Sequence, residues 1–302
     1  MSAGNNDDSV DTSCCASCGI AEIDDIKLNE CDDCDLVKYC SDECLSHHKS
    51  EHEEACKRRA AELRDELLFK QPENTYMGDC PICNLPLSLD RSKSIIYSCC
   101  CKSVCDGCCY ANEKRQMEMR IAKSCPFCRK PEPKTKEEAE KLVLKRVEAN
   151  DPEALFQEGT MWYEKGEFIR AFEYWTKAAG LGEVEAHYRL SWLYYHGEGV
   201  EKDIGKGNYH LEEAAIGGHP LARHNLGVYE WVDNENNERA VKHFIIAATQ
   251  GQDEPMDNLM IAFKRGLVEK EVLAAVLRAH KAAVDATKSP QRKAAEKWYR
   301  FM

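Results

Sequence analysis

Residues 31–56 read CDDCDLVKYCSDECLSHHKSEHEEAC, and this stretch holds most of the side chains that decide how the front of the chain folds. With the CxxC motif just before it, it gives four ligand pairs: Cys15 and Cys18, Cys31 and Cys34, Cys40 and Cys44, His52 and Cys56. A zinc ion takes four thiolate or imidazole ligands, and two ligands with two or three residues between them can both reach one ion from a tight turn. Four pairs therefore predict two zinc sites. The segment is too short for an apolar core, so we expect metal binding to supply most of its folding free energy.

The 18 cysteines of the chain all lie between Cys14 and Cys128. Disulfides belong to oxidising compartments. The first residues are polar and acidic, and we expect no signal peptide there. No apolar stretch approaches the roughly 18 residues that a membrane span requires, so no membrane partner is expected. The cysteines thus predict a reduced, intracellular metalloprotein, cytoplasmic or nuclear.

Charge separates the first zinc-binding segment from nucleic-acid-binding fingers. Residues 1–57 carry 15 acidic and 4 basic side chains. Such a surface repels phosphate backbones instead of neutralising them. We therefore expect protein partners and no nucleic acid.

The motif Tyr39-Cys40-Ser41-Asp42-Glu43-Cys44, with His52 and Cys56 behind it, resembles the MYND finger over residues 15–56. The resemblance implies interleaved sites, one held by Cys15, Cys18, Cys40 and Cys44 and the other by Cys31, Cys34, His52 and Cys56. It also implies binding of short proline-containing peptides from partner proteins. At the position where MYND fingers usually have a tryptophan in the peptide groove, this chain has Lys49. Where they commonly have a glutamine, it has Leu45. Cys14, His47 and His48 fall outside the spacing and are interpreted as non-ligands.

A second cluster follows, with Cys80-Pro81-Ile82-Cys83, Cys99-Cys100-Cys101-Lys102, Cys105-Asp106-Gly107-Cys108 and Cys125-Pro126-Phe127-Cys128. Eight ligands in cross-braced order predict two more ions. The cluster resembles a RING finger over residues 80–131. That resemblance implies one ion on Cys80, Cys83, Cys105 and Cys108, and another on Cys125, Cys128 and two of Cys99, Cys100 and Cys101.

The middle of this cluster departs from the RING pattern. Lys102 occupies the usual histidine position, and a protonated lysine cannot coordinate zinc. Cys100 stands at the usual third-ligand position and is favoured. The sequence does not choose between Cys99 and Cys101 as its companion, and the predicted set contains Cys99 and Cys100. Cys109 is interpreted as a non-ligand.

RING fingers commonly act as ubiquitin ligases, which hold a ubiquitin-conjugating enzyme and catalyse by positioning. They perform no bond chemistry themselves, so we predict no catalytic residue. The resemblance implies that Ile82, Pro126 and Arg129 contact the conjugating enzyme, because a guanidinium can make forked hydrogen bonds to both proteins. The same residues have equally simple structural explanations: Ile82 and Pro126 can serve local packing, and Arg129 can be an ordinary surface cation. The sequence leaves open a RING-type E3 ubiquitin ligase and a non-enzymatic adaptor that only docks proteins.

The second half of the chain repeats. The pairs Ala178-Ala179, Ala214-Ala215, Ala247-Ala248 and Ala282-Ala283 recur at offsets of 36, 33 and 35, in frame with Leu190, Leu226 and Leu259 and with Gly182, Gly218 and Gly251. A period in the mid-thirties is typical of a helix-pair solenoid. Residues 186–203 resemble the Sel1-like repeat, a relative of the tetratricopeptide repeat.

Each residue type in the repeat predicts a structural role. Alanines let paired helices approach closely, Trp175, Trp192 and Tyr195 fill gaps, and glycines end the helices. Asp203 is predicted to cap a helix. The solenoid is expected to present a concave surface to protein partners, including a substrate protein.

The predicted fold class is therefore two small zinc-stabilised modules followed by an all-α helix-pair solenoid, with four zinc ions, two in each finger. The predicted segments are a disordered N-terminus at 1–13, a MYND-type finger at 14–57, a helical linker at 58–77, a RING-type finger at 78–133, a second helical linker at 134–150, Sel1-like repeats at 151–290 and a C-terminal tail or cap at 291–302.

Overall fold

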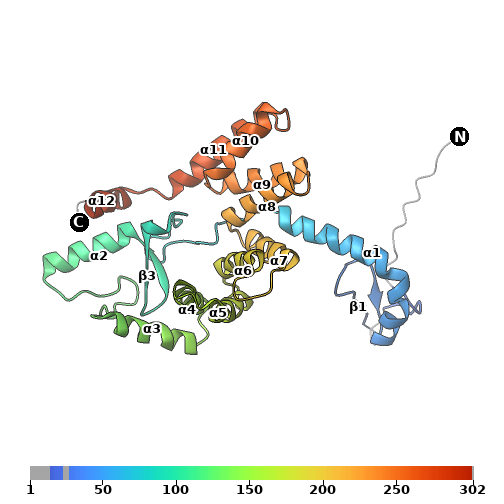
Figure 1. Cartoon of the computed structure of the whole chain (residues 1–302), viewed down its shortest axis with the longest axis horizontal. Coiled ribbons are helices and arrows are strands. Elements are labelled where there is room, and N and C mark those ends of the chain that lie inside the picture. The colour runs from blue at the N-terminus through green and yellow to red at the C-terminus, as the bar shows by residue number, and fades with distance from the viewer. Residues whose placement is uncertain (1–13, 23–26, 301–302) are drawn as a thin grey trace. The chain divides into compact units, whose positions relative to one another are not determined.

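The structure, a computed structural model, describes residues 14–22 and 27–300. The disorder predicted for residues 1–13 lies outside the described residues. The chain divides into two compact units, residues 1–70 and 71–302, which are described separately below (Figure 1).

The first unit is a small finger with one long helix. Strand β1 (Asn29–Glu30) pairs antiparallel with β2 (Lys38–Tyr39). Helix α1 (Asp42–Phe69) begins inside the finger, where the Ser41 hydroxyl accepts a hydrogen bond from the Cys44 N–H over 3.3 Å. The predicted linker helix is thus the continuation of α1, and residues 70–77 are not helical.

The second unit begins with a cysteine-rich module, here called the second module, residues 78–133. The 3₁₀ turn η1 (Arg91–Lys93) leads into β3 (Ser94–Tyr97), which pairs antiparallel with β4 (Lys102–Cys105). Helix α2 (Asp106–Met119) follows directly. Helix α3 (Lys136–Glu148) occupies the predicted second linker.

Four helix pairs follow this module in the sequence and form the solenoid. Their bounds are α4 (Pro152–Glu164), α5 (Phe168–Gly180), α6 (Val184–His196), α7 (Ile204–Ile216), α8 (Pro220–Val232), α9 (Asn237–Thr249), α10 (Glu254–Lys264) and α11 (Lys270–Ala286). In the first three pairs the two helices pack on each other, and the second helix of each pair packs on the first helix of the next pair. The fold is therefore the predicted one, cysteine-rich zinc-binding modules followed by a helical solenoid.

Most of the repeat pattern has its expected structural role. Gly182, Gly218 and Gly251 follow helix ends with φ of 88°, 86° and 90°, a conformation that glycine adopts without a Cβ penalty. The leucines of the same frame, Leu190, Leu226 and Leu259, are buried. Asp203 caps α7 by accepting a hydrogen bond from the Lys206 N–H over 3.0 Å.

The prediction that Trp192 fills a gap between helices is wrong. Its side chain is 48% exposed and stacks on His196 one turn along α6, with ring centroids 3.9 Å apart. Trp175, in contrast, is buried against Gly159, where a Cβ would lie 2.5 Å from its ring. The repeat period alone predicts that both tryptophans lie between helices. Only side chains on the helix face that is turned toward the neighbouring helix are buried.

The fourth repeat departs from the other three. Helix α11 packs more on α9 than on α10, and its alanines Ala282 and Ala283 are not buried, although the earlier alanine pairs are. Helix α12 (Pro290–Tyr299), expected as a tail or a cap, packs on α2 of the second module (Figure 1).

Among the described residues, no helix combines the length and the apolar character that crossing a bilayer would take.

Candidate metal centres

Three tight turns of one geometry carry the CxxC motifs at residues 15–18, 80–83 and 125–128. The residue after each second cysteine is left-handed, with φ of 75° at Gly19, 54° at Asn84 and 61° at Arg129. Its N–H donates to the carbonyl of the first cysteine over 2.8, 2.9 and 2.9 Å respectively. This closed turn holds both thiols of each motif within reach of a single ion.

Four groups of thiol or imidazole side chains gather in the structure, and the ligand atoms of each group lie within 4.8 Å of one another. We call them tetrad 1 (Cys15, Cys18, Cys40, Cys44), tetrad 2 (Cys31, Cys34, His52, Cys56), tetrad 3 (Cys80, Cys83, Cys105, Cys108) and tetrad 4 (Cys99, Cys100, Cys125, Cys128). All sixteen side chains predicted as ligands are brought together, in the interleaved order that the two resemblances imply.

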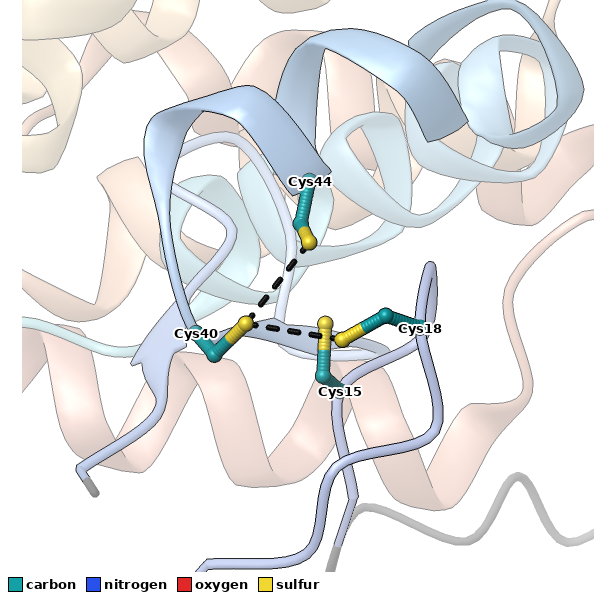
Figure 2. A group of neighbouring side chains, drawn as sticks. All are labelled: Cys15, Cys18, Cys40 and Cys44. Carbon is teal, nitrogen blue, oxygen red and sulfur yellow. Dashed lines mark hydrogen bonds between the residues drawn. The ribbon is translucent and has the colours of Figure 1, made fainter. Parts of the chain in front are cut away.

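The spacing of the sulfur atoms fits a shared metal ion. Figure 2 shows the thiols of tetrad 1 converging, with the Cys40 sulfur 3.5 Å from that of Cys18 and 3.6 Å from that of Cys44. Comparable pairs in tetrads 2 to 4 lie 3.3 to 3.8 Å apart. Four thiolates at about 2.3 Å from one zinc ion would lie about 3.8 Å apart, whereas a disulfide is about 2.05 Å long. None of the described cysteines forms a disulfide. The four tetrads are thus compatible with zinc.

His52 supplies the one imidazole of the four tetrads. It is buried on α1, and its Nε2 lies 3.2 Å from the Cys34 sulfur. Burial, together with His48, lowers the pKa of His52, which keeps the ring neutral as a metal ligand requires. His48 stacks on His52 and its Nδ1 lies 3.0 Å from the Tyr39 hydroxyl. His48 lies outside the four tetrads, and the sequence spacing gave no sign that it packs against His52.

The three adjacent cysteines of the second module separate in the structure. Cys99 and Cys100 face tetrad 4, where the Cys99 sulfur lies 3.3 Å from that of Cys128. Cys101 is buried outside the tetrad in a left-handed conformation, with φ of 50°. Burial, and then the charge of Asp151, raise the pKa of Cys101 to about 12, so this thiol stays protonated. The left-handed residue turns the chain between β3 and β4, a change of direction that spacing alone does not reveal.

One thiol of tetrad 3 ionises readily. The hydrogen bond from the Cys105 side chain is the main cause, and with nearby backbone N–H groups it outweighs burial and lowers the pKa of Cys80 to about 4. Thiolates are the form that binds a divalent cation.

The three residues predicted to contact a conjugating enzyme lie on the turns of the second module. Ile82 is 42% exposed, Arg129 is exposed and Pro126 is half-buried. Phe127, between the two cysteines of the last motif, is 43% exposed and was not singled out from the sequence. Its position matches that of Ile82 in the other turn, so the repeated turn geometry is the signal that could have identified it.

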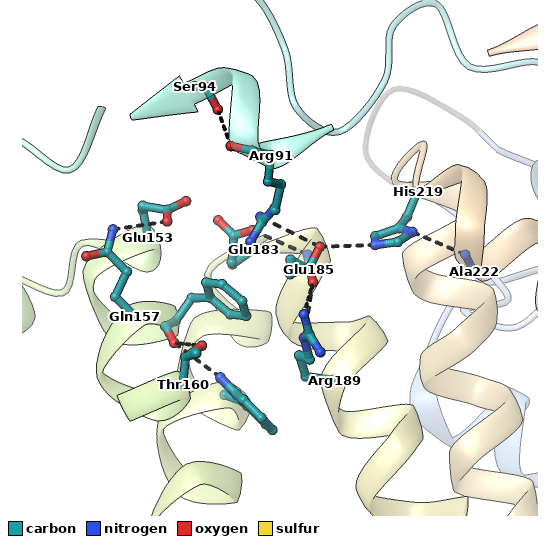
Figure 3. Close-up of polar contacts among 12 residues, drawn as sticks. Arg91, Ser94, Glu153, Gln157, Thr160, Glu183, Glu185, Arg189, His219 and Ala222 are labelled. Atoms are coloured by element: carbon teal, nitrogen blue, oxygen red, sulfur yellow. Dashed lines mark hydrogen bonds and ion pairs between the residues drawn. The ribbon is translucent and has the colours of Figure 1, made fainter. Parts of the chain in front are cut away.

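The second module is fixed to the solenoid through a buried acid. Figure 3 shows Arg91 of η1 directed at Glu185 of α6, which also binds Arg189 and His219. The carboxylate lies 3.6 Å from Arg91 Nη2, 3.0 Å from Arg189 Nη2 and 3.1 Å from His219 Nε2. Burial would raise the pKa of Glu185, but these partners, His219 first, lower it to about 2. Tyr76 stacks on His219 with centroids 4.3 Å apart.

A cleft of about 1330 Å³ opens between the second module and the last repeats. Residues 71–75 and 86–90 form one wall, and the α9–α10 and α11–α12 junctions form the other. Acidic side chains outnumber basic ones along it. The acids are Glu73, Asp79, Asp90, Asp106, Asp253, Glu254 and Glu296, and the bases are Lys93, Lys288, Arg292 and Lys293.

Two family models match parts of the chain. Residues 152–183, 184–219 and 220–252 match the Sel1 repeat, and residues 15–56 match the MYND finger. The chain therefore has a MYND finger and three Sel1 repeats. Helices α10 and α11, predicted as a fourth unit, lie beyond the matched repeats, and neither match extends over the cysteines of the second module.

Three solved structures resemble parts of this one at low identity. A Sel1 repeat protein from Oxalobacter formigenes is 20% identical with a TM-score of 0.41, over 61% of this chain and 73% of that one. A protective antigen of uropathogenic Escherichia coli with an SLR fold is 22% identical with a TM-score of 0.40, over 55% and 37% of the two chains. An immunity protein of Pseudomonas aeruginosa is 19% identical with a TM-score of 0.40, over 52% and 64%.

Proposed function

We propose that this protein is a zinc-binding interaction scaffold whose second module works as a RING-type E3 ubiquitin ligase. In this proposal the second module holds a ubiquitin-conjugating enzyme, and the solenoid holds the substrate protein. Tetrads 1 to 4 each hold one zinc ion, whose part is to stabilise the modules and not to react.

The backbone of Arg129 carries the proposal. At φ of 61° a residue other than glycine costs about 1 kcal/mol, and the equivalent position of the first finger is Gly19. The Arg129 side chain offsets none of this cost within the described part of the chain, because no hydrogen bond or ion pair links it to another described residue. An exposed arginine held on a strained turn is suited to bind a partner. Its forked donors fit two carbonyls at once, as bridging an enzyme and its ubiquitin would require.

Exposed apolar side chains on two CxxC turns of the second module offer the rest of such a contact surface. Ile82 and Phe127 project from matching turns, and Pro126 lies next to Phe127. Exposed apolar side chains next to a charged anchor are typical of the centre of a protein–protein interface.

For substrate capture we propose the cleft between the second module and the last repeats. Its excess of acidic side chains favours a protein segment rich in lysine and arginine. For the first module, binding of proline-containing peptides remains a proposal, and Lys49 at the groove position predicts weaker binding than a tryptophan there would give.

Self-ubiquitination of the full chain with a panel of conjugating enzymes tests the ligase proposal. We expect at least one enzyme to support it. Arg129→Ala should slow it about tenfold, the effect of losing one charge-assisted hydrogen bond worth about 1.5 kcal/mol. The neighbouring exposed cation gives the matched control, Lys130→Ala, which should leave the rate unchanged.

The adaptor is the second candidate, and one observation favours it. Residues 120–124, before the first cysteine of the last motif, contain none of the bulky aromatic residues that RING ligases often have there. If no conjugating enzyme in the panel supports the reaction, and Arg129→Ala changes nothing, the second module only docks proteins.

A further inference from the structure

The last helix of the chain is joined to the second module instead of the stack from which it emerges. Pro290 starts α12, and the Ser289 hydroxyl caps it by accepting a hydrogen bond from the Arg292 N–H over 3.1 Å. Ala295 is fully buried, and Trp298 lies 5.5 Å from the ring of Tyr110 on α2. This contact joins residues almost 190 positions apart, so it is a specific tertiary contact and not an effect of chain proximity.

A buried arginine lies at the centre of this contact. Arg292 is only 7% exposed. Its Nη1 donates to the Pro86 carbonyl over 2.6 Å and to the Thr287 carbonyl over 2.7 Å. Its Nη2 donates to the Leu85 carbonyl over 3.2 Å and to the sulfur of Cys83 over 3.5 Å. The guanidinium therefore binds the turn that carries the first CxxC motif of tetrad 3.

Buried guanidinium groups need a counter-charge. In the described part of the chain, Arg292 forms no ion pair with a carboxylate. With a divalent cation bound to tetrad 3, the negative charge nearest along the hydrogen bonds of Arg292 would be the sulfur of Cys83, which Nη2 reaches over 3.5 Å. Four thiolates around one divalent cation carry a net charge of about −2, and Cys80, Cys105 and Cys108 are themselves buried. Arg292 and a metal-loaded tetrad 3 would thus compensate each other's charge, and the Asp106 carboxyl also interacts electrostatically with Arg292.

Gly107 shows how closely α12 must approach. This residue lies between two tetrad-3 positions at the start of α2, and a Cβ there would be 2.8 Å from both the Cγ and the backbone N of Arg292. A methyl group would therefore push the arginine backbone away from the tetrad. Gly107→Ala displaces the guanidinium without changing its chemistry.

We propose that Arg292 is a positioning residue of the tetrad-3 metal centre, donating a hydrogen bond to the Cys83 thiolate and balancing the charge of the cluster. Metal binding and the docking of α12 then stabilise each other, because a coupling free energy between two events acts equally in both directions. Partners that hydrogen-bond a metal ligand commonly change metal affinity 10- to 100-fold. The inference rests on the proposed zinc occupancy of tetrad 3.

The test measures zinc release from the full chain with a chromogenic chelator. In Arg292→Met we expect one of four ions to leave about 10 to 100 times faster while the other three keep their rates. Arg292→Lys should be intermediate, since an ammonium keeps the charge but not the fork. Lys293→Met, the exposed neighbour, is the matched control and should release zinc as the wild type does.

A second readout keeps the inference testable if an Arg292 variant fails to fold. In the wild-type chain, withdrawal of zinc should expose the amides of α12 to hydrogen exchange while the amides of α4 to α9 stay protected. Gly107→Ala should show the same exposure before any zinc is removed. If α12 stays protected without zinc, or if Arg292→Met releases every ion at the wild-type rate, the coupling is wrong although zinc binding stands. A wild-type chain with no zinc in tetrad 3 contradicts the zinc proposal itself.

Discussion

The second module and the solenoid are built by opposite means inside one compact unit. In the module, buried side chains are largely cysteines, and its helix and strands are too few to enclose an apolar core. In the solenoid, alanines, leucines and single large rings fill the space between helices. From this difference we expect the module to require a bound metal ion to fold, whereas the solenoid carries its stabilising groups in its own sequence.

Two intrinsic probes distinguish the regions. The 18 cysteines all precede residue 129, and the five tryptophans, Trp162, Trp175, Trp192, Trp231 and Trp298, all lie in the solenoid or α12. Zinc content and thiol reactivity therefore report on the modules, and tryptophan fluorescence reports on the solenoid and α12.

Metal removal should give the largest effect. Elemental analysis of the purified chain should show four zinc ions. Thorough chelation under reducing conditions should abolish amide protection in β3, β4 and α2, because metal binding supplies the folding free energy there. The tryptophan-detected unfolding of the solenoid should persist. A second module that keeps its protection after chelation contradicts the premise that metal holds it together.

Truncation of a core side chain should destabilise the solenoid and leave the zinc content of the modules unchanged. Leu190 is fully buried in α6, and Leu190→Ala should lower the free energy of unfolding of the solenoid by about 2–5 kcal/mol. Tryptophan fluorescence in urea measures this. Leu181→Ala, at a half-exposed position of the α5–α6 turn, is the control and should cost far less. Zinc content should stay the same in both variants, and its loss in Leu190→Ala would show that the regions are not independent.

Two glycines of one turn should respond with opposite signs. Gly182 has φ of 88°, so Gly182→Ala should destabilise the solenoid by about 1 kcal/mol. Gly180 ends α5, and a Cβ there meets nothing within 4 Å. Gly180→Ala should therefore stabilise by about 0.4–1 kcal/mol through a less flexible unfolded chain. Urea midpoints compared at equal slope check both, and equal effects in the two variants would contradict the backbone argument.

The last expected effect depends on pH and lies where the two regions meet. Burial, and then the charge of Glu153, raise the pKa of Glu183 from 4.5 to about 7, with Arg91 and Glu185 also nearby. Since the folded state binds this proton more tightly, unfolding free energy should fall as pH rises from about 4.5 to about 7 and be flat above. Glu183→Gln should flatten that decline in tryptophan-detected unfolding. If the unfolding free energy of Glu183→Gln falls with pH as steeply as that of the wild type, this carboxyl does not cause the pH dependence.

Sequence reasoning succeeded where a local rule fixes the outcome. The structure gathers the sixteen predicted side chains in four groups, and the glycines at 182, 218 and 251 follow helix ends as the period predicts. Sequence reasoning failed where it had to decide which face of a helix is buried, as for the exposed Trp192. It also failed where the repeat diverges, as for Ala282 and Ala283, which are not buried. Between Cys99 and Cys101 the sequence did not decide, because the left-handed turn at Cys101 sets the direction of both thiols.

By itself the sequence determined the cysteine-rich modules, three of their four tetrads and the solenoid, because ligand spacing and a repeat period each depend on residues close together in the chain. Only the tertiary structure decided that α12 leaves the stack, that Arg292 lies on the Cys83 turn and that Arg91 lies beside Glu185. These contacts join residues roughly 90 to 200 positions apart, and their free energy depends on shape and buried charge that no local pattern encodes.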